Sequence, residues 1–444
     1  MPKTYPIVVL LLCIGALALP AHARPQDQEL ILGGPQARSA SEALTNRAVQ
    51  EGTSGDIYRG TVFGAEKKTY PGTVLGQRQT PEKKLMYDTS LIHAIKSNDA
   101  DRVRTLIYAN VDVNEKNYAG ITPLTLAAEK GNLPIIQLLV ERGHADVDQK
   151  SNYGITPLIA AAAAGQSKAV IYLLGQGADS KLKDDSGKIP LLYASKFNEP
   201  QVISLLAHAS MDSIDLADSD GNNALIYSTQ RGYLENVQNL LKNGADVNYV
   251  NPLTGLSALS TAAAEGHLPI IKFLAKKGHA NVNTVDKAGK SPLFYAIEQD
   301  QPQALKTLLS LKADPNQPDF AGVTPLMHAA ALNRQECLQF LLGKRINIHA
   351  QDNQGRTVLT YSAYAADDTL TKKLIQAHAD IDVPDGDGNT PLMHAIMAKN
   401  DGAAVLLLQR GANPKRANKK GETPASLVAQ FLPRSNTARL LKAQ

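Results

Sequence analysis

The chain has 444 residues, of which 43% are hydrophobic and 20% charged, and its formal net charge is +4. This composition is typical of a globular protein, and so small and dispersed a charge disfavours a nucleic-acid partner. The absence of Trp and the low Phe content disfavour a large aromatic-lined cofactor pocket, so we expect no cofactor.

The first 23 residues have the pattern of a secretory leader. Lys3 precedes the apolar run 7–19, and Ala21-His22-Ala23 has the small residues of a cleavage site. The apolar run is too short for an ordinary membrane-spanning helix, and no later stretch is longer. We therefore expect export, with no membrane span after cleavage. A bacterial periplasm is the expected destination, and secretion from the cell is the alternative.

One cysteine, Cys337, follows the leader. A single thiol cannot form an internal disulfide, so stability must come from packing. Cys337 falls where other parts of the chain carry Ile135 or Val170, and we expect it to be a small buried hydrophobe. The scarcity of cysteine fits a bacterial envelope protein.

Residues 24–86 are rich in Gly and Pro and poor in aliphatic side chains. This composition predicts an irregular linker or arm. The pattern changes at residue 87, where a repeat begins.

Glycines then recur at intervals of 33 or 34 residues, which chance does not produce over so many steps. They are Gly120, Gly154, Gly187, Gly221, Gly255, Gly289, Gly322, Gly355, Gly388 and Gly421. After half of them stands a Thr-Pro-Leu or Ser-Pro-Leu phrase, and Thr423-Pro424 follows Gly421. A repeat of this length indicates one supersecondary unit stacked many times.

Each part of the repeated phrase has a physical role. The glycine supplies a turn with positive φ, Thr122 can cap a helix, and Pro123 suits the first helical position. Gly131 can end this helix in a left-handed conformation, and a second helix with apolar spacing follows from Leu133. The phrase therefore predicts a turn followed by two antiparallel helices.

These motifs are similar to those of the ankyrin repeat. The resemblance covers residues 87–444 and implies an all-α solenoid of about eleven helix-turn-helix units with β-hairpin or finger loops. It divides the repeat domain into an N-terminal cap (87–117), nine internal repeats (118–420) and a C-terminal cap (421–444). It implies that finger loops and first helices line the concave side.

Two departures from the ankyrin pattern affect this expectation. The family usually places His directly after Thr-Pro-Leu, whereas this chain has other residues there, such as Thr125 and Met327. The usual polar network between neighbouring first helices is therefore in doubt. Beyond Gly289, residues such as Asp300 and Lys399 replace helix-ending glycines, so we expect these repeats to open locally more easily.

No motif in the chain indicates catalysis or metal binding. Gly289-Lys290-Ser291 resembles the end of a phosphate-binding loop but lacks its earlier glycine. The Asp-rich stretches 218–222 and 385–389 resemble calcium loops, but neither has the Glu that completes such a loop. We expect Asp218 and Asp385 to hydrogen-bond their own turns, and we expect neither an enzyme nor a metal site.

The ankyrin resemblance implies that a partner protein contacts the finger tips and the exposed ends of the first helices. The candidate residues at the finger tips are Tyr118, Ile121, Tyr153, Ile155, Leu253 and Phe320. The candidates at the helix ends are Phe197, Arg231 and Tyr364. The alternative is a structural role, in which the aromatic rings pack along the fingers as part of the solenoid.

The expected function is that of an exported scaffold or adaptor that binds proteins through its concave finger and inner-helix surface. The alternative is a secreted effector that binds host proteins. The lack of a strong charge along the predicted groove argues against a strongly acidic or basic partner.

Overall fold

The structure is a computed structural model that describes residues 89–343, 345–364 and 368–443. The chain divides into two units, Met1–Arg78 and Gln79–Gln444. The predicted leader (1–23) and the predicted arm (24–86) lie outside the described residues. In the described part the regular structure is helical, apart from one isolated antiparallel bridge between Val250 and Ser257. The predicted all-α class is confirmed.

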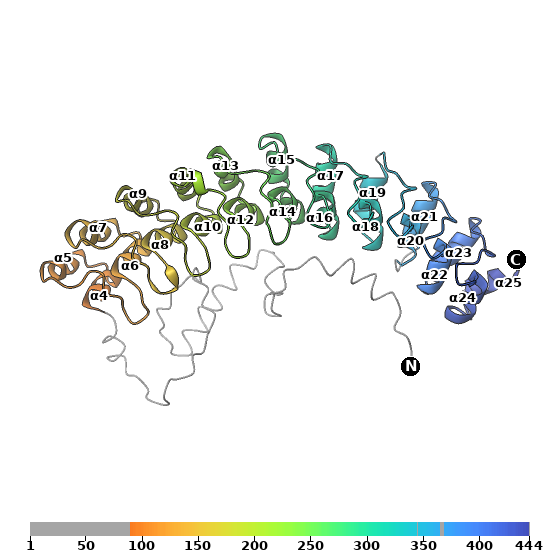
Figure 1. Ribbon diagram of the computed structural model, residues 1–444, viewed down its shortest axis with the longest axis horizontal. Helices are drawn as coiled ribbons and strands as arrows, with labels where there is room; N and C mark the ends of the chain where they lie inside the picture. The colour runs from red at the N-terminus through yellow and green to blue at the C-terminus, as the bar shows by residue number, and fades with distance from the viewer. Residues whose placement is uncertain (1–88, 344, 365–367, 444) are drawn as a thin grey trace, which may run out of the picture. The chain divides into compact units, whose positions relative to one another are not determined.

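Within the described residues the helices form eleven successive pairs (Figure 1). The first helices of the pairs are α4 (Ser90–Lys96), α6 (Pro123–Lys130), α8 (Pro157–Ala163), α10 (Pro190–Ser195), α12 (Ala224–Gln230), α14 (Ala258–Ala264), α16 (Pro292–Glu298), α18 (Pro325–Ala331), α20 (Val358–Ser362), α22 (Pro391–Met397) and α24 (Pro424–Phe431). The second helices are α5 (Ala100–Tyr108), α7 (Leu133–Gln137), α9 (Ser167–Gly175), α11 (Pro200–Ala209), α13 (Leu234–Lys242), α15 (Leu268–Lys276), α17 (Pro302–Ser310), α19 (Gln335–Leu342), α21 (Thr369–Gln376), α23 (Asp401–Gln409) and α25 (Asn436–Ala443).

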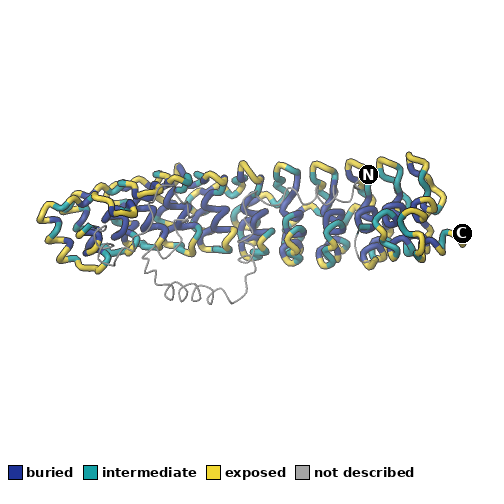
Figure 2. Tube along the Cα trace, turned by 90° about the horizontal axis from the view of Figure 1, so that it is seen from below, coloured by how far each residue is buried: buried dark blue, intermediate teal, exposed yellow. Residues whose placement is uncertain are grey.

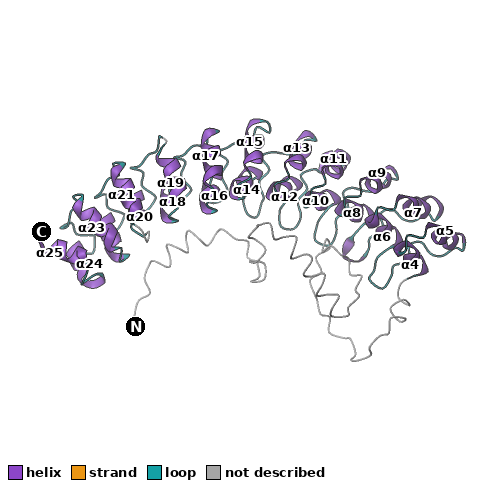
Figure 3. Ribbon diagram, turned by 180° about the vertical axis from the view of Figure 1, so that it is seen from behind, coloured by secondary structure: helices purple, strands orange, loops and turns teal. Residues whose placement is uncertain are grey.

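The helix pairs build two layers. The first helices pack side by side in one layer, and the second helices form the other (Figures 1 and 3). The turns that precede the first helices, called fingers below, project from the first-helix layer. Within this unit the row of pairs bends toward the fingers, which places the fingers and first helices on the predicted concave side.

Local sequence signals start and end the helices as expected. The Thr122 hydroxyl accepts a hydrogen bond from the Thr125 N–H, and Pro123 follows it at the first position of α6. Gly131 ends α6 at φ 67°, and its N–H bonds the carbonyls of Ala127 and Ala128. These contacts satisfy backbone groups that would otherwise lack partners at the helix ends.

One extra residue in two of the longer repeats is absorbed where the second helix ends. After α7 the chain continues as a π-helix over Leu138–Arg142, and the Gly143 N–H reaches the carbonyl of Leu138, five residues back. At the corresponding place Gly278 bonds to Phe273. The wider turn accommodates the insertion without displacing the next finger.

Non-glycine residues adopt the left-handed conformation at several helix ends beyond Gly289. These residues are Asp300 (φ 51°), Lys312 (φ 70°), Asn333 (φ 53°), His378 (φ 64°) and Lys399 (φ 59°). The left-handed conformation is less stable by roughly 1–2 kcal/mol for a residue with a Cβ. Five residues before Gly289 have the same conformation: Asn98, Asn110, His144, Tyr153 and His279. That the later repeats open more readily therefore stays a prediction.

The core runs between the two helix layers along the whole row (Figure 2). Alanines permit close approach of the first helices, and all residues of α8, from Pro157 to Ala163, are buried. Cys337 is fully buried, and burial raises the pKa of its thiol to about 12. It is a small core residue, as predicted.

Candidate functional site

Each finger is a hairpin turn, and in all but the finger 151–155, which has Ser151, an aspartate or asparagine closes the turn. In the finger 319–323, the Asp319 N–H bonds the Val323 carbonyl, and one Asp319 carboxylate oxygen accepts from the N–H groups of Ala321 and Val323. Asp218 and Asp385 hold their turns in the same way, as the sequence predicted. Among the described residues no group of three His, Cys, Asp or Glu side chains could hold a metal ion.

Neighbouring fingers are joined by backbone hydrogen bonds between their tips. The Phe320 N–H donates to the Ala288 carbonyl at 2.9 Å, and the Asn353 N–H donates to the Ala321 carbonyl at 3.0 Å. The tip glycine is required both for its positive φ and for the close approach of the next finger. A Cβ added to Gly322 would lie 2.7 Å from the Asn353 nitrogen. Between the fingers that begin at Asp184 and Asp286, side chains make this link instead, as where the Asn251 amide donates to the Asp220 carbonyl.

A polar network connects the fingers to the first helices behind them. A finger aspartate accepts a hydrogen bond from a tyrosine hydroxyl nine residues later in the chain. The pairs are Asp184 and Tyr193 (2.5 Å), Asp218 and Tyr227 (2.5 Å), Asp286 and Tyr295 (2.5 Å), and Asp352 and Tyr361 (2.7 Å). Burial and the hydrogen-bonded carboxylates raise the pKa of these tyrosines, which stay protonated and act as donors.

His394 replaces tyrosine at this position in the α22 repeat. Its Nε2 lies 2.7 Å from an Asp385 carboxylate oxygen, and its Nδ1 lies 2.9 Å from the Tyr364 hydroxyl. Burial raises the pKa of Asp385, but the hydrogen bond and charge of His394 outweigh this and hold it below its usual value. The three side chains join the α22 finger to the end of α20.

This network revises the expectation drawn from the missing histidine after Thr-Pro-Leu. A polar network does exist, but it uses a hydroxyl or imidazole farther along the first helix. The nine-residue spacing between Asp184 and Tyr193, repeated at Asp218 and Tyr227, was visible in the sequence. It was not singled out from the sequence because Asp and Tyr at this spacing match no motif that was considered.

Four of the predicted tip residues present large apolar or aromatic side chains to solvent. Their exposed fractions are 83% for Tyr118, 68% for Tyr153, 64% for Leu253 and 68% for Phe320. Phe320 is exposed although its ring also lies against Gly289 of the preceding finger. We call these four residues the tip patch. At the helix ends, Arg231 is exposed and Phe197 is 37% exposed.

Three other predicted residues are not exposed anchors. Ile155 is only 4% exposed, because the residue after a tip glycine turns into the start of the next helix and packs in the core. Ile121, at the same position in the preceding finger, is half-buried for the same reason. Tyr364 is half-buried and its hydroxyl is bonded to His394, and burial raises its pKa. The expectation that Ile155 is exposed at the tip is therefore wrong, whereas a role of the half-buried Tyr364 in partner binding stays a prediction.

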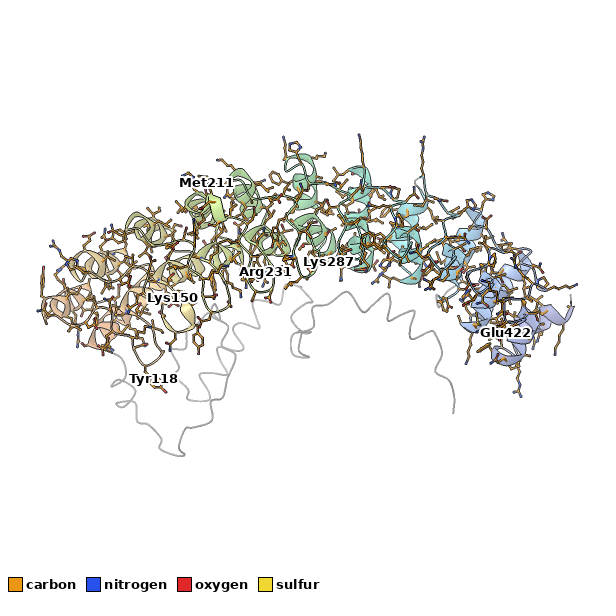
Figure 4. The ribbon with its side chains drawn as sticks, in the orientation of Figure 1. Tyr118, Lys150, Met211, Arg231, Lys287 and Glu422 are labelled. Carbon is orange, nitrogen blue, oxygen red and sulfur yellow. The ribbon has the colours of Figure 1, made fainter. Side chains whose placement is uncertain are left out.

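The second-helix side also has exposed apolar residues, which sequence reasoning did not single out. Tyr108 is 70% exposed, Ile171 54% and Met211 58%. Figure 4 labels Met211 on the side opposite Tyr118 and Arg231. None of the helices in the described ranges is both long and apolar enough to cross a membrane.

Comparison with protein families identifies these helix pairs. The family model "Ankyrin repeats (3 copies)" matches residues 91–184, 164–251, 238–319, 313–385 and 362–444. The chain belongs to the ankyrin-repeat family. Ankyrin repeats mediate protein–protein interaction, and the family is typically a non-catalytic scaffold.

Several curated proteins are similar to parts of this repeat array. "Ankyrin repeat protein nuc-2" of Neurospora crassa is 30% identical over 177 residues, which are 33% of this chain and 17% of that protein. "Neurogenic locus notch homolog protein 1" of Homo sapiens is 32% identical over 199 residues, 42% of this chain and 8% of that protein. "Putative palmitoyltransferase ZDHHC13" of Danio rerio is 27% identical, covering 53% of this chain and 36% of that protein. The chain thus spans well under half of each of these relatives.

Proposed function

We propose that this ankyrin-repeat chain is an exported, non-enzymatic adaptor that binds protein partners through its fingers and first helices. The observation that carries the proposal is the tip patch. Four large apolar or aromatic side chains, each at least 64% exposed, stand on the fingers. The fingers of Tyr118 and Tyr153 are neighbours joined by a backbone hydrogen bond from the Asn152 N–H to the Gly120 carbonyl. Tyr and Phe bury a large area with few rotatable bonds, which suits them to protein interfaces.

The rigidity of the finger row adds to this support. The tips of neighbouring fingers are fixed by bonds such as Asp185 N–H to the Tyr153 carbonyl, at 3.0 Å. A partner that binds such a surface loses little conformational entropy of the protein, so more of the contact energy appears as affinity. Contacts on several fingers at once would add further affinity.

Export is the part of the proposal that rests on sequence alone. The charged, apolar and small-residue segments of 1–23 follow the order of a secretory signal. We expect the protein isolated from its native cell to begin at Arg24. A periplasmic fraction that contains the protein, with none in the medium, supports an envelope adaptor, whereas recovery in the medium supports the secreted effector.

The experiment that tests partner binding uses affinity capture from the native cell with three baits. The first bait is the native chain, and the second carries alanine at the tip patch, Tyr118, Tyr153, Leu253 and Phe320. The third is a matched control with alanine at Tyr108, Ile171 and Met211, which are similarly exposed on the second-helix side.

We expect one or more proteins to bind the native chain and the control but not the tip variant. Equal capture by all three baits would show that the tip patch is not the binding site. Loss of binding in the control alone would place the site on the second-helix side.

A further inference from the structure

Two cations stand at the ends of neighbouring first helices on the finger side. Lys196 follows the last turn of α10, and Arg231 follows the last turn of α12. Figure 4 labels Arg231 at the finger-side edge of the row. The helix dipole stabilises a cation at a helix C-terminus. The repeat itself does not require it, because α14 and α16 end at Glu265 and Gln299.

The amine of Lys196 has a fixed position. It lies 4.4 Å from the centre of the Tyr227 ring, and the Tyr227 hydroxyl donates to Asp218 at 2.5 Å. The backbone next to it is also held, because the Phe197 carbonyl accepts a hydrogen bond from the Asn236 amide at 2.9 Å. A ligand would therefore meet a cation that is already oriented.

Neither cation has an acidic partner among the described residues, whereas other cations on the same side do. Lys290 pairs with Glu298 at 2.5 Å, and Arg356 pairs with Asp352 at 2.6 Å. Lys196, in contrast, is half-buried over the Tyr227 ring and forms no ion pair among the described residues. Burial, and next the positive charge of Lys188, lowers the pKa of Lys196, while Asp218 and Asp220 offset part of this effect.

A half-buried charge without a counterion is unfavourable, since buried charges are normally paired. The free protein already bears the cost of removing water from Lys196. An incoming carboxylate would supply the missing counterion without further desolvation of that amine. The geometry thus favours an anionic ligand at this place.

The surroundings leave room for a ligand and offer one apolar contact. At the equivalent position of the preceding repeat stand Ala163 and Ala164, and Ala264 occupies it in the α14 repeat. Their side chains end at Cβ, so the surface on both sides of Lys196 is low, whereas the exposed Glu265 stands at the position equivalent to Arg231 in the α14 repeat. Phe197, beside Lys196, is 37% exposed.

We propose that Lys196 and Arg231 bind the carboxylate of an acidic residue in an extended segment of a protein partner. Phe197 packs against an apolar side chain next to that carboxylate. The proposal rests on the proposed protein-binding function and names the chemistry of one part of that surface. It differs from the expectation that the groove lacks a strong charge, because a net charge is a sum over the chain whereas folding places these two cations at neighbouring helix ends.

The local charges favour a protein segment over a nucleic acid. Nucleic-acid binding draws its affinity from many phosphate contacts. The proposed contact uses two cations, Lys196 and Arg231, and the exposed carboxylate of Asp220 stands on the finger that leads into α12. That carboxylate would repel a second phosphate, but it would not obstruct a chain with one acidic residue.

The test is equilibrium binding to the full chain, followed by fluorescence anisotropy. The probe is a short labelled peptide with Glu-Phe-Glu in a Gly-Ser background, beside the same peptide with Gln-Phe-Gln and a short labelled oligothymidylate. The test variant is Lys196→Gln with Arg231→Gln. The matched control is Lys272→Gln with Lys276→Gln, which removes the same charge from exposed positions of α15.

We expect saturable binding of the Glu-Phe-Glu peptide that falls about tenfold or more in the test variant and stays unchanged in the control. Arg231→Gln alone, at an exposed position, gives the same direction of change if the double variant unfolds. Equal binding of the Gln peptide, equal weakening in the control, tighter binding of the oligonucleotide, or no binding of any peptide overturns the proposal. Capture through the tip patch is independent of this result, so failure here is distinguishable from failure of the proposed function.

Discussion

Replacing Gly322 by alanine separates the two reasons why a finger tip needs glycine. Gly322 has φ 79°, and an added Cβ would lie 2.7 Å from the Asn353 nitrogen and 3.0 Å from the Asp352 Cα. Gly187 has nearly the same φ, 78°, but its Cβ would meet no atom closer than the Ser219 nitrogen at 3.4 Å. Both glycines lie in internal repeats, so Gly187→Ala is a matched control.

The expected magnitudes follow from these two geometries. Gly187→Ala introduces only the left-handed strain of a residue with a Cβ, roughly 1–2 kcal/mol. Gly322→Ala adds a backbone displacement of the next finger, which costs about 1–3 kcal/mol more by analogy with overpacked cores. We therefore expect Gly322→Ala to lower the free energy of unfolding by about 2–5 kcal/mol.

The assay combines urea denaturation with hydrogen exchange, since long repeat arrays do not always unfold in one step. The informative amide is that of Asn353, which donates to the Ala321 carbonyl. Its exchange should accelerate strongly in Gly322→Ala and stay unchanged in Gly187→Ala. If the two variants lose the same stability and Asn353 stays protected in both, the close approach of the fingers does not explain the glycine.

Three further predictions concern single side chains that are buried or half-buried. Burial raises the pKa of Glu129 to about 7, so its folded form holds a proton more tightly than the unfolded chain does, and stability falls as pH rises from about 4.5 through 7. Glu129→Gln should therefore be more stable than the native chain by about 1 kcal/mol at pH 8, allowing for solvent screening, and equally stable at pH 4. A difference in urea midpoints that does not change with pH would contradict this. Tyr361→Phe removes the hydroxyl that bonds Asp352 and should cost about 1–3 kcal/mol, whereas Tyr153→Phe, at an exposed tip, should change the denaturation midpoint little. In the chain without residues 1–23, Cys337 should react with a thiol reagent only after unfolding, because it is buried and its pKa is raised to about 12, and rapid reaction in native buffer would refute this.

The repeat fold was predictable from sequence because its signals are local. Thr122, Pro123 and Gly131 each act on backbone groups within four residues, and the same signals return every 33 or 34 residues. A pattern of this kind predicts where helices begin and end without knowledge of distant contacts. The exposed tips at Tyr118 and Phe320 could be placed for the same reason, since they stand just before the tip glycine.

The candidate site was less predictable because exposure and pairing depend on neighbouring repeats. Ile155 follows its glycine by one residue and turns into the core, so the tip ends one residue earlier than its composition suggested. Tyr364 looked like an exposed aromatic at a helix end, but its hydroxyl bonds His394 in the next repeat. Neither outcome can be predicted from the sequence of a single repeat.

The sequence by itself determined the helix pairs, the tip glycines and the apolar finger tips, because short-range capping and turn geometry decide them. Only the tertiary structure decided which residues of adjacent repeats meet, as Lys196 meets the ring of Tyr227 from the following repeat. Such contacts join residues about one repeat apart, and their energies depend on the burial of both partners. Stacking creates that burial, and it also leaves Lys196 and Arg231 on the finger side without an acidic partner among the described residues.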